Sequence, residues 1–208
     1  SYQQFRRKNV RIQKGIRVPM KGGHVQNTTV IAKFRAALPS LVEWINATIA
    51  AHETQAKPFS SIWFRSIPKF VPKDLLDRAR VVYLPTVPRP PLTSLGIPEL
   101  AEFERFQLDG ITFRDMVFMK LRKSNAEDLH LHELVHVAQW DLLGDERFLL
   151  AYGVGLLQKG YRSSPLEEMA YLYQGLLTNE KLTTAMMSDV RLRTERLWSE
   201  VAPLVSGS

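Results

Sequence analysis

The chain has 208 residues, 45% of them hydrophobic, which is enough for one domain of ordinary size, and nothing in it requires a second one. It contains no cysteine, so disulfides and cysteine-ligated metal sites are excluded, and any transition metal would have to bind to His, Asp or Glu. No apolar run approaches the roughly 18–20 residues of a membrane-spanning helix. Because the chain begins at Ser1 and ends in Ser206-Gly207-Ser208, we expect a shortened form from which any signal or anchor has been removed.

The net charge of +7 is concentrated near the N-terminus. Nine of the 28 Lys and Arg residues, and none of the 21 Asp and Glu residues, lie within residues 1–35. We therefore divide the chain into a basic, irregular N-terminal arm, residues 1–27, and a single domain, residues 28–208. We expect the arm to be solvated. The alternative is that it contacts an anionic partner, either nucleic acid or an anionic membrane surface.

The first half of the domain mixes helical and irregular segments. Apolar residues at helical spacing begin near Thr28, and we expect Pro39 to divide this helix or to start its second part. Residues 58–72 carry aromatic side chains and three prolines, which is typical of a packed irregular connector. A short helix over residues 73–80 and a strand over residues 79–84 are predicted to follow.

The centre of the chain is predicted to form a loop and a hairpin. Five prolines within residues 85–98 indicate an extended surface loop, and a short helix over residues 98–106 comes next. Asp109-Gly110 is a turn signal. The β-prone runs 111–113 and 116–119, joined by Arg114-Asp115, predict a hairpin.

The remainder is predicted to be helical. Ser124 and Glu127 have the spacing of a capping box, and Gly144 would end the helix that they begin. Asp145 would cap a second helix that ends at Gly160, Ser164-Pro165 would open a third, and a last one would cover residues 188–201. The expected fold class is α+β: a mostly helical domain with a small β-sheet or hairpin before the helix that begins near Ser124.

The chemistry is predicted to lie in His132-Glu133-Leu134-Val135-His136. Residues four apart share one face of a helix, so both imidazoles can bind one metal ion, and Glu133 can reach a water held there. This division of roles suits hydrolysis: the metal polarises a carbonyl, and the carboxylate transfers the proton. The alternative is an ordinary core helix, with histidines bonded to backbone carbonyls and Glu133 exposed. Apolar neighbours make the metal site the favoured interpretation, because buried ionisable side chains need partners.

A third protein ligand is expected downstream. His130 is two residues from His132 and faces elsewhere, and His24 and His52 lie far away in the sequence. Glu167 is favoured, because Ala170 at i+3 would let another helix approach the same face. In the alternative, Glu167 forms a capping box with Ser164 and Glu168 is the ligand.

His132-Glu-Leu-Val-His136 followed by Glu167-x-x-Ala170 resembles the gluzincin branch of zinc metallopeptidases, over roughly residues 79–175. The resemblance is greatest to compact bacterial forms with a strand hairpin just before the active-site helix. It implies a zincin-like fold, Zn²⁺ as the cofactor, His132, His136 and Glu167 as its ligands, and Glu133 as general base. It also implies that the strand around residues 116–120 lines the cleft and pairs with an extended substrate.

The chain departs from that family at Tyr171. Many gluzincins have an Asp there, four residues after the ligand Glu, which holds a ligating histidine in the correct tautomer. Asp141, Asp145 or a backbone carbonyl are the substitutes we consider. Gluzincins also often use a His or Tyr to stabilise the tetrahedral intermediate, and the candidates here are Tyr152 and Tyr161, with Tyr173 as a further one.

Three functions follow from these motifs. The favoured one is a zinc-dependent peptidase that acts on a peptide or protein substrate. The second is a zincin-fold protein that binds metal or partners without turnover, and the intact His-Glu-His set argues against it. The third assigns the main role to the basic arm, in a nucleic-acid-associated protease with salt-sensitive binding to DNA.

Overall fold

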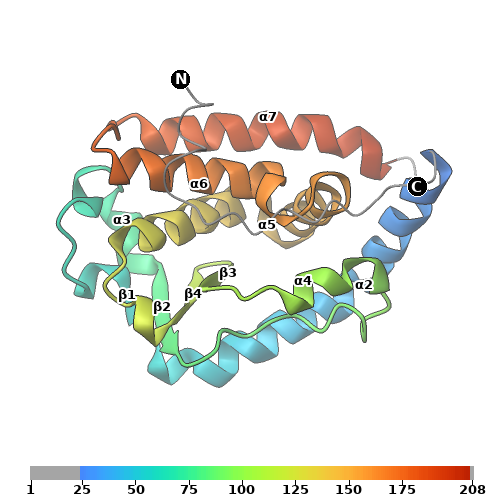
Figure 1. Ribbon diagram of the computed structural model, residues 1–208, viewed down its shortest axis with the longest axis horizontal. Coiled ribbons are helices and arrows are strands. Elements are labelled where there is room, and N and C mark those ends of the chain that lie inside the picture. The colour runs from blue at the N-terminus through green and yellow to red at the C-terminus, as the bar shows by residue number, and fades with distance from the viewer. Residues whose placement is uncertain (1–23, 207–208) are drawn as a thin grey trace.

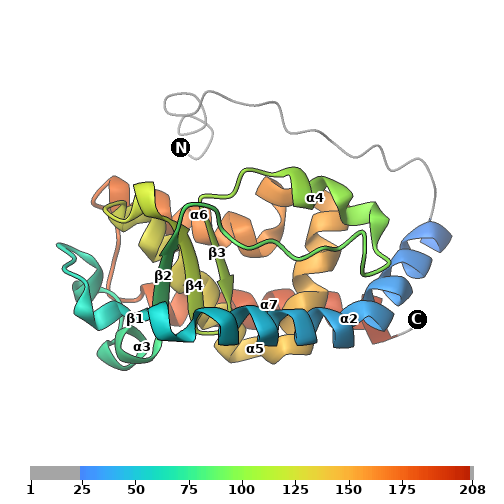
Figure 2. The same ribbon diagram turned by 90° about the horizontal axis from the view of Figure 1, so that it is seen from below.

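The computed structural model describes residues 24–206, so residues 1–23, and with them most of the expected arm, lie outside the described residues. Helix α2 (His24–His52) begins four residues before Thr28. The predicted division at Pro39 is wrong, because α2 is one helix that continues through this residue, although its N-terminal part is inclined to the remainder (Figure 2). Pro39 is exposed, and the buried Leu38 and Leu41 on either side of it pack into one core. The position at which proline lacks a backbone N–H donor is therefore on the solvent side of the helix, while the apolar face is uninterrupted.

Four short strands form one sheet in the order β1-β2-β4-β3. Strand β2 (Arg80–Leu84) pairs in parallel with β4 (Met116–Lys120), and β1 (Lys57–Pro58) pairs antiparallel with β2. Strand β3 (Gly110–Phe113) forms the predicted antiparallel hairpin with β4. The two-residue turn between them requires a positive φ of 56° at Arg114. Strand β1 was not predicted and lies at the start of the proline-containing connector.

The sheet lies between helix α2 and the first half of helix α5 (Glu127–Lys159), as Figure 1 shows. Alternate residues of each strand point to opposite faces of a sheet. Accordingly, Val117 and Met119 pack with Leu131 and Leu134 of α5, whereas Met116 and Phe118 belong to the core on the α2 side. The expected α+β fold, mostly helical with a small sheet, is thus confirmed. In addition to the predicted hairpin, the sheet contains the pairings of β2 with β1 and with β4.

The connections between strands are short helices and loops. Helix α3 (Lys73–Arg78) precedes β2, and residues 85–97, all of which are described, contain neither helix nor strand. A 3₁₀ turn (Pro98–Leu100) leads into α4 (Ala101–Arg105). The predicted proline-rich loop and short helix are therefore confirmed. Together they form a segment whose Glu99 pairs with Lys33 of α2 at 2.9 Å.

Helix α5 is interrupted at Gly144, where φ is 67° and ψ is 179°, and its two halves run in different directions (Figures 1 and 2). The predicted end at Gly144 is confirmed, because a positive φ favours glycine. The predicted capping box is wrong: Ala126 is the N-cap residue, and Glu127 accepts hydrogen bonds from the backbone N–H groups of Ser66 and Ile67 at 2.6 and 2.8 Å. A contact with a distant segment takes the place of the local cap.

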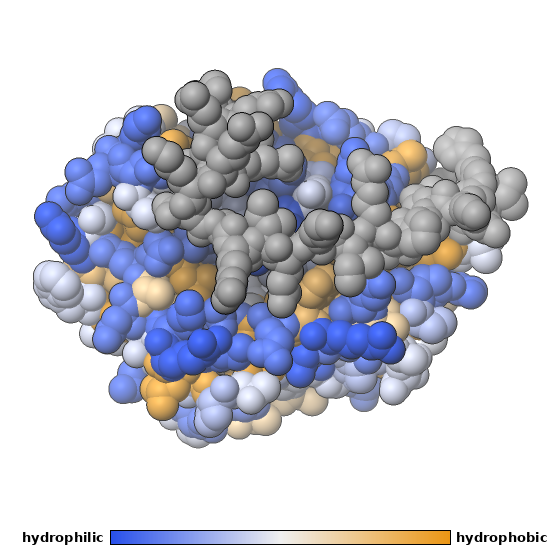
Figure 3. Space-filling model, in the orientation of Figure 1, coloured by the Kyte–Doolittle hydropathy of each residue, from blue (hydrophilic) through white to orange (hydrophobic). Residues whose placement is uncertain are grey.

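Two further helices pack on α5. Helix α6 (Pro165–Thr178) begins with Pro165 at its first position, as predicted, and α7 (Met186–Ser206) extends beyond both predicted ends. Both contact α5 and each other (Figure 1). The face seen in Figure 3 is mostly hydrophilic, with apolar residues in smaller areas between. Among residues 24–206, no helix combines the length and the apolar character needed to cross a membrane.

Candidate metal centre

The predicted motif lies in the first half of α5, where residues 130–140 are all buried. A helix that is buried on every side must find partners for its polar side chains inside the protein. His132, Glu133 and His136 are only 3%, 3% and 5% exposed. This burial contradicts the alternative interpretation of the motif, in which Glu133 faces solvent.

Helix α6 brings Glu167 to the two histidines. Nε2 of His132 and Nε2 of His136 are 3.2 Å apart, and they lie 3.4 and 3.3 Å from Oε2 and Oε1 of Glu167. The three residues offer ligand atoms that lie within 4.8 Å of one another, and Glu167 is 2% exposed. The sequence placed the two histidines together, and the structure adds the favoured carboxylate to them. The group can hold a metal ion.

The histidines and Glu167 shift each other's pKa values toward the charged forms. Burial alone would raise the pKa of Glu167, but the charges and hydrogen bonds of His136 and His132 outweigh it and lower that pKa. Burial acts to lower the pKa of His136, yet the carboxylate of Glu167 raises it to about 9. A positive charge between these side chains is therefore favoured, and a divalent cation would take the place of the proton. Oε2 of Glu167 is buried and faces Nε2 of His132 at 3.4 Å, so both atoms are placed to serve as ligands.

Glu133 lies between this group and strand β3. Thr112 Oγ1 donates a hydrogen bond to its Oε2 at 2.7 Å. Gly110 approaches the other oxygen so closely that a Cβ at this position would lie 2.2 Å from Oε1. Burial raises the pKa of Glu133, and the positive charges of His132 and His136 act against that rise. A carboxylate held in this way is suited to accept a proton from a water at the metal position.

The predicted role of the strand at residues 116–120 is wrong. Strand β4 pairs with β2 on one side and with β3 on the other, so both of its edges are occupied. Of the two hairpin strands, β3 lies at an edge of the sheet, and it is β3 that carries the residues next to Glu133. The reason is the order of the strands: the hairpin was predicted, but its second strand is covered by the parallel pairing with β2.

Gln139 holds one of the histidines and was missed in the sequence. Its side-chain oxygen accepts a hydrogen bond from Nδ1 of His136 at 2.8 Å, which leaves Nε2 free to bind a metal. Its Nε2 donates a hydrogen bond, at 3.2 Å, to the carbonyl of Leu166, which is the residue directly before Glu167. In the sequence, the available signal for this contact was that Gln139 follows His136 by three residues. The substitutes that we considered lie elsewhere, because Asp141 pairs with Arg78 and Asp145 with Arg114.

Tyr171, at the position of the expected Asp, packs against the other histidine. The two ring centroids are 4.6 Å apart, with the rings inclined by 60°. Nδ1 of His132 is buried and has no hydrogen-bond partner among the described residues. An aromatic contact therefore orients this imidazole, where a carboxylate would bond to it in the family pattern.

Two of the three tyrosine candidates lie at the group. Tyr152 donates a hydrogen bond to Oε1 of Glu167 at 2.6 Å. Burial and the charge of Glu167 raise the pKa of both Tyr152 and Tyr161 well above the ordinary value, so both hydroxyls stay protonated and can donate. Tyr173 instead donates to Asp189, on α7, and does not belong to the group.

The residues discounted as ligands are occupied elsewhere. His130 bonds to Tyr83 and to the carbonyl of Ala126, at 2.7 and 2.8 Å, and is an ordinary core histidine. Nδ1 of His52 bonds to the carbonyl of Thr48 at 2.8 Å. The structure does not describe the side chain of His24. Glu168 is exposed on α6.

The capping alternative for Glu167 is also contradicted. Ser164 is the N-cap residue of α6, but its side chain makes no capping hydrogen bond, and the carboxylate of Glu167 is turned toward the histidines. The three-residue spacing from Ser164 to Glu167 is therefore not a capping box. Packing of α6 on α5 decides the direction of this side chain.

The group opens into a pocket with an empty volume of about 690 Å³, open solvent included. His132, Glu133, His136 and Glu167 form part of its wall, and β3 forms another part. The remaining wall is made of apolar and aromatic side chains from α2, from the segment 90–108 and from the second half of α5. A metal ion at the group would thus face a space with a mostly apolar wall.

No protein-family model, no curated protein and no solved structure matches this chain.

Proposed function

We propose that this protein is a zinc-dependent peptidase of the gluzincin type. The observation that carries the proposal is the meeting of four buried side chains from two helices. His132, His136 and Glu167 offer their ligand atoms to one point, and the carboxylate of Glu133 lies next to it. Three protein ligands with an open position and a neighbouring carboxylate are the parts that metal-assisted hydrolysis requires.

The donor set suits zinc. Two imidazole nitrogens and one carboxylate are common ligands of catalytic zinc. Ligands placed tetrahedrally at the usual Zn–N and Zn–O lengths are separated by roughly 3.3 Å. In this group the two Nε2 atoms are 3.2 Å apart, and they lie 3.4 and 3.3 Å from different oxygens of Glu167, which is close to the spacing that the ion requires.

Zinc, when bound, would polarise the scissile carbonyl and increase the acidity of a nearby water. Glu133 would accept the proton of the attacking water and deliver it to the nitrogen of the leaving amine. Thr112 keeps the carboxylate of Glu133 in place during both transfers. Tyr152 and Tyr161, which keep their protons, are the available donors to the negative charge that develops on the carbonyl oxygen.

The alternative is a metal-binding or interaction protein without turnover. Glu133 distinguishes the two functions, because metal binding alone needs the three ligands and no second carboxylate. Burial of an ionisable side chain beside two histidines costs free energy. Here that side chain is also held by Thr112 and by close contact with Gly110, which favours a role in proton transfer.

The test combines metal content with hydrolysis. The purified chain should contain about one zinc per molecule and should cleave members of a quenched-fluorescent peptide library, and a chelator should abolish the cleavage. Glu133→Gln should retain zinc and lose hydrolysis, since an amide keeps the shape of the side chain but cannot accept the proton. Glu168→Gln, on the exposed face of α6, is the matched control and should behave as the parent. Cleavage by Glu133→Gln at the parent rate would refute the assignment of the base.

A further inference from the structure

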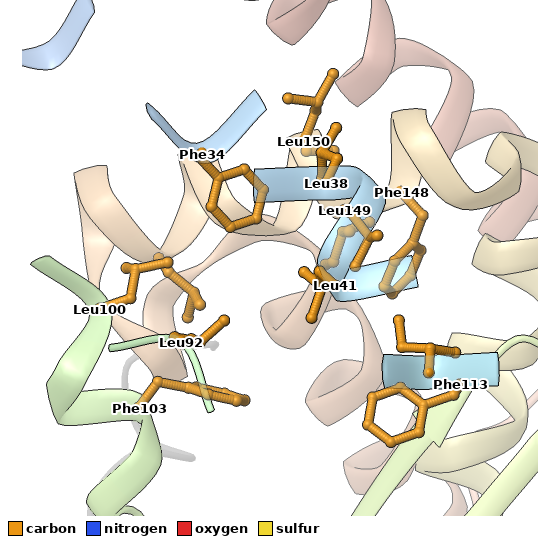
Figure 4. Close-up of a cluster of buried hydrophobic side chains, with 14 of the residues drawn as sticks. Phe34, Leu38, Leu41, Leu92, Leu100, Phe103, Phe113, Phe148, Leu149 and Leu150 are labelled. Atoms are coloured by element: carbon orange, nitrogen blue, oxygen red, sulfur yellow. The ribbon is translucent and has the colours of Figure 1, made fainter. Parts of the chain in front are cut away.

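Most large apolar side chains of this protein point toward one another inside the fold, as the core residues of Figure 4 do. Trp63 is an exception. It is 85% exposed, which is the largest exposed fraction of any large apolar side chain within residues 24–206. Tryptophan is highly buried in most proteins, and it is enriched where a protein meets a partner or a membrane. An indole that the fold holds in water is therefore a candidate contact residue.

The loop that carries Trp63 is fixed by packing and hydrogen bonding. Phe59, at its start, is fully buried. At its end, the backbone N–H of Ser66 donates a hydrogen bond to the carboxylate of Glu127 at 2.6 Å. Phe64, directly after Trp63, stacks on Phe59 with a distance of 6.1 Å between the ring centroids. Because its neighbour is packed inward, the indole is directed outward by a well-packed support.

The same segment is basic. Residues 54–73 include four Lys and Arg residues and no Asp or Glu, whereas the other described residues include 17 Lys and Arg against 21 Asp and Glu. The four cations are all exposed, and they are Lys57, Arg65, Lys69 and Lys73. Lys73 pairs with Asp77 at 2.5 Å, and the other three make no ion pair with any residue that the structure describes. The segment between β1 and α3 lies at the outer edge of the molecule, at the end opposite the start of α2 (Figures 1 and 2).

We propose that this loop binds an anionic lipid surface, with the indole of Trp63 at the level where the headgroups meet the acyl chains. Tryptophan is enriched at that level of a membrane. The long stems of lysine and arginine let their charged ends stay among the lipid phosphates, and each cation near the surface adds to the attraction. None of these residues lines the pocket of the metal centre, so the inference goes beyond the proposed function and does not rest on it.

Two other kinds of partner fit this surface less well. Protein interfaces bury about 800 Å² on each side and are depleted in lysine, whereas three of the four cations here are lysines around one exposed ring. Sites for single-stranded nucleic acid stack successive bases on several aromatic side chains. Phe59 and Phe64, the other rings of this loop, pack in the core, so the loop presents one ring only.

Binding of the full chain to lipid vesicles tests the proposal. The chain should bind vesicles of phosphatidylcholine mixed with phosphatidylglycerol and should not bind phosphatidylcholine alone. Added salt should weaken the binding, because it screens the surface charges. On binding, the emission of Trp63 should shift to the blue and should be quenched by lipids brominated in the upper part of the acyl chain. Trp63→Phe retains an apolar ring and isolates the signal of Trp63 from that of the three other tryptophans.

Two pairs of variants assign the binding to this loop. Trp63→Ser should weaken vesicle binding by about 10-fold or more. Leu204→Ser, at a position that is 40% exposed in the last turn of α7, is the matched control and should bind as the parent does. Arg65→Glu combined with Lys69→Glu should also weaken binding by about 10-fold or more. Arg191→Glu combined with Arg196→Glu changes the net charge equally on the exposed face of α7 and should have a much smaller effect.

Three results would overturn the inference. Unchanged vesicle binding in Trp63→Ser would assign the lipid contact to another part of the chain, such as the basic residues 1–21. Quenching of Trp63 by a single-stranded oligonucleotide that binds more tightly than vesicles would identify a nucleic-acid surface. A blue shift that grows with protein concentration in the absence of lipid would identify a contact between two copies. Glu133→Gln should bind vesicles as the parent does, so this inference and the proposed function fail or stand separately.

Discussion

Gly110 lies against the carboxylate of Glu133, at a distance where a Cβ would stand 2.2 Å from Oε1 and 2.8 Å from the carboxyl carbon. The contact joins the edge strand of the sheet to the motif helix. A methyl group there must displace the side chain of Glu133, because the backbone of β3 is held by its pairing with β4.

We therefore expect Gly110→Ala to reduce turnover by about 100-fold or more while zinc content stays at one ion per chain. A displacement of about 1 Å in a catalytic group can cost this much. The measurement is kcat on a cleaved library peptide, together with metal analysis of the same preparation. A variant with the turnover of the parent would show that the position of Glu133 does not limit the reaction.

The adjacent carboxylates of α6 give a matched pair. Glu167 is buried at the histidines, whereas Glu168 is exposed, because neighbours on a helix point about 100° apart. Glu167→Ala should lower zinc affinity by more than about 100-fold, which exceeds the usual effect of removing a group that merely orients a ligand. Glu168→Ala should leave the affinity unchanged. Competition with a chelating dye measures both, and the reverse order of effects would reassign the third ligand.

Gln139 is expected to position a ligand without touching the metal. Gln139→Leu keeps its approximate size and removes the hydrogen bonds to His136 and to Leu166. Zinc affinity should fall by roughly 10- to 100-fold. Gln139→Glu retains an acceptor for Nδ1 of His136 and should recover most of the affinity. The ring-nitrogen NMR shifts of His136 report the tautomer directly, and an unchanged tautomer in Gln139→Leu would contradict this role.

Zinc should also stabilise the fold. A ligand that binds only the folded chain, at about 100 times its Kd, adds about 2.7 kcal/mol to the free energy of unfolding. For a chain of this length, that corresponds to a rise of roughly 5–10 °C in Tm. His132→Ala should abolish the zinc-dependent part of Tm, because it removes one ligand of the group. Calorimetry with and without zinc measures the difference, and a Tm that zinc does not change would argue against the site.

Several elements could be predicted from the sequence because their signals are local. The hairpin around Arg114-Asp115, the proline-rich loop and the break at Gly144 depend on turn chemistry within a few residues, and each is present. Local signals failed where a distant segment competed. Ser124 does not cap α5, because Glu127 bonds to backbone amides 60 and 61 residues away. Pro39 does not end α2, because a continuous apolar face packs on the core.

The sequence by itself determined that His132 and His136 share a helix face with Glu133 beside them, since a spacing of four residues sets that geometry in any α-helix. Only the tertiary structure decided which carboxylate joins them. It also decided that β3, and not β4, lies at an edge of the sheet, and that Gly110, Thr112 and Gln139 surround the motif. The physical reason is one of range. The period of a helix fixes directions within one element, but the meeting of α5 with α6 and β3 depends on how whole faces pack, and no spacing along the chain encodes it.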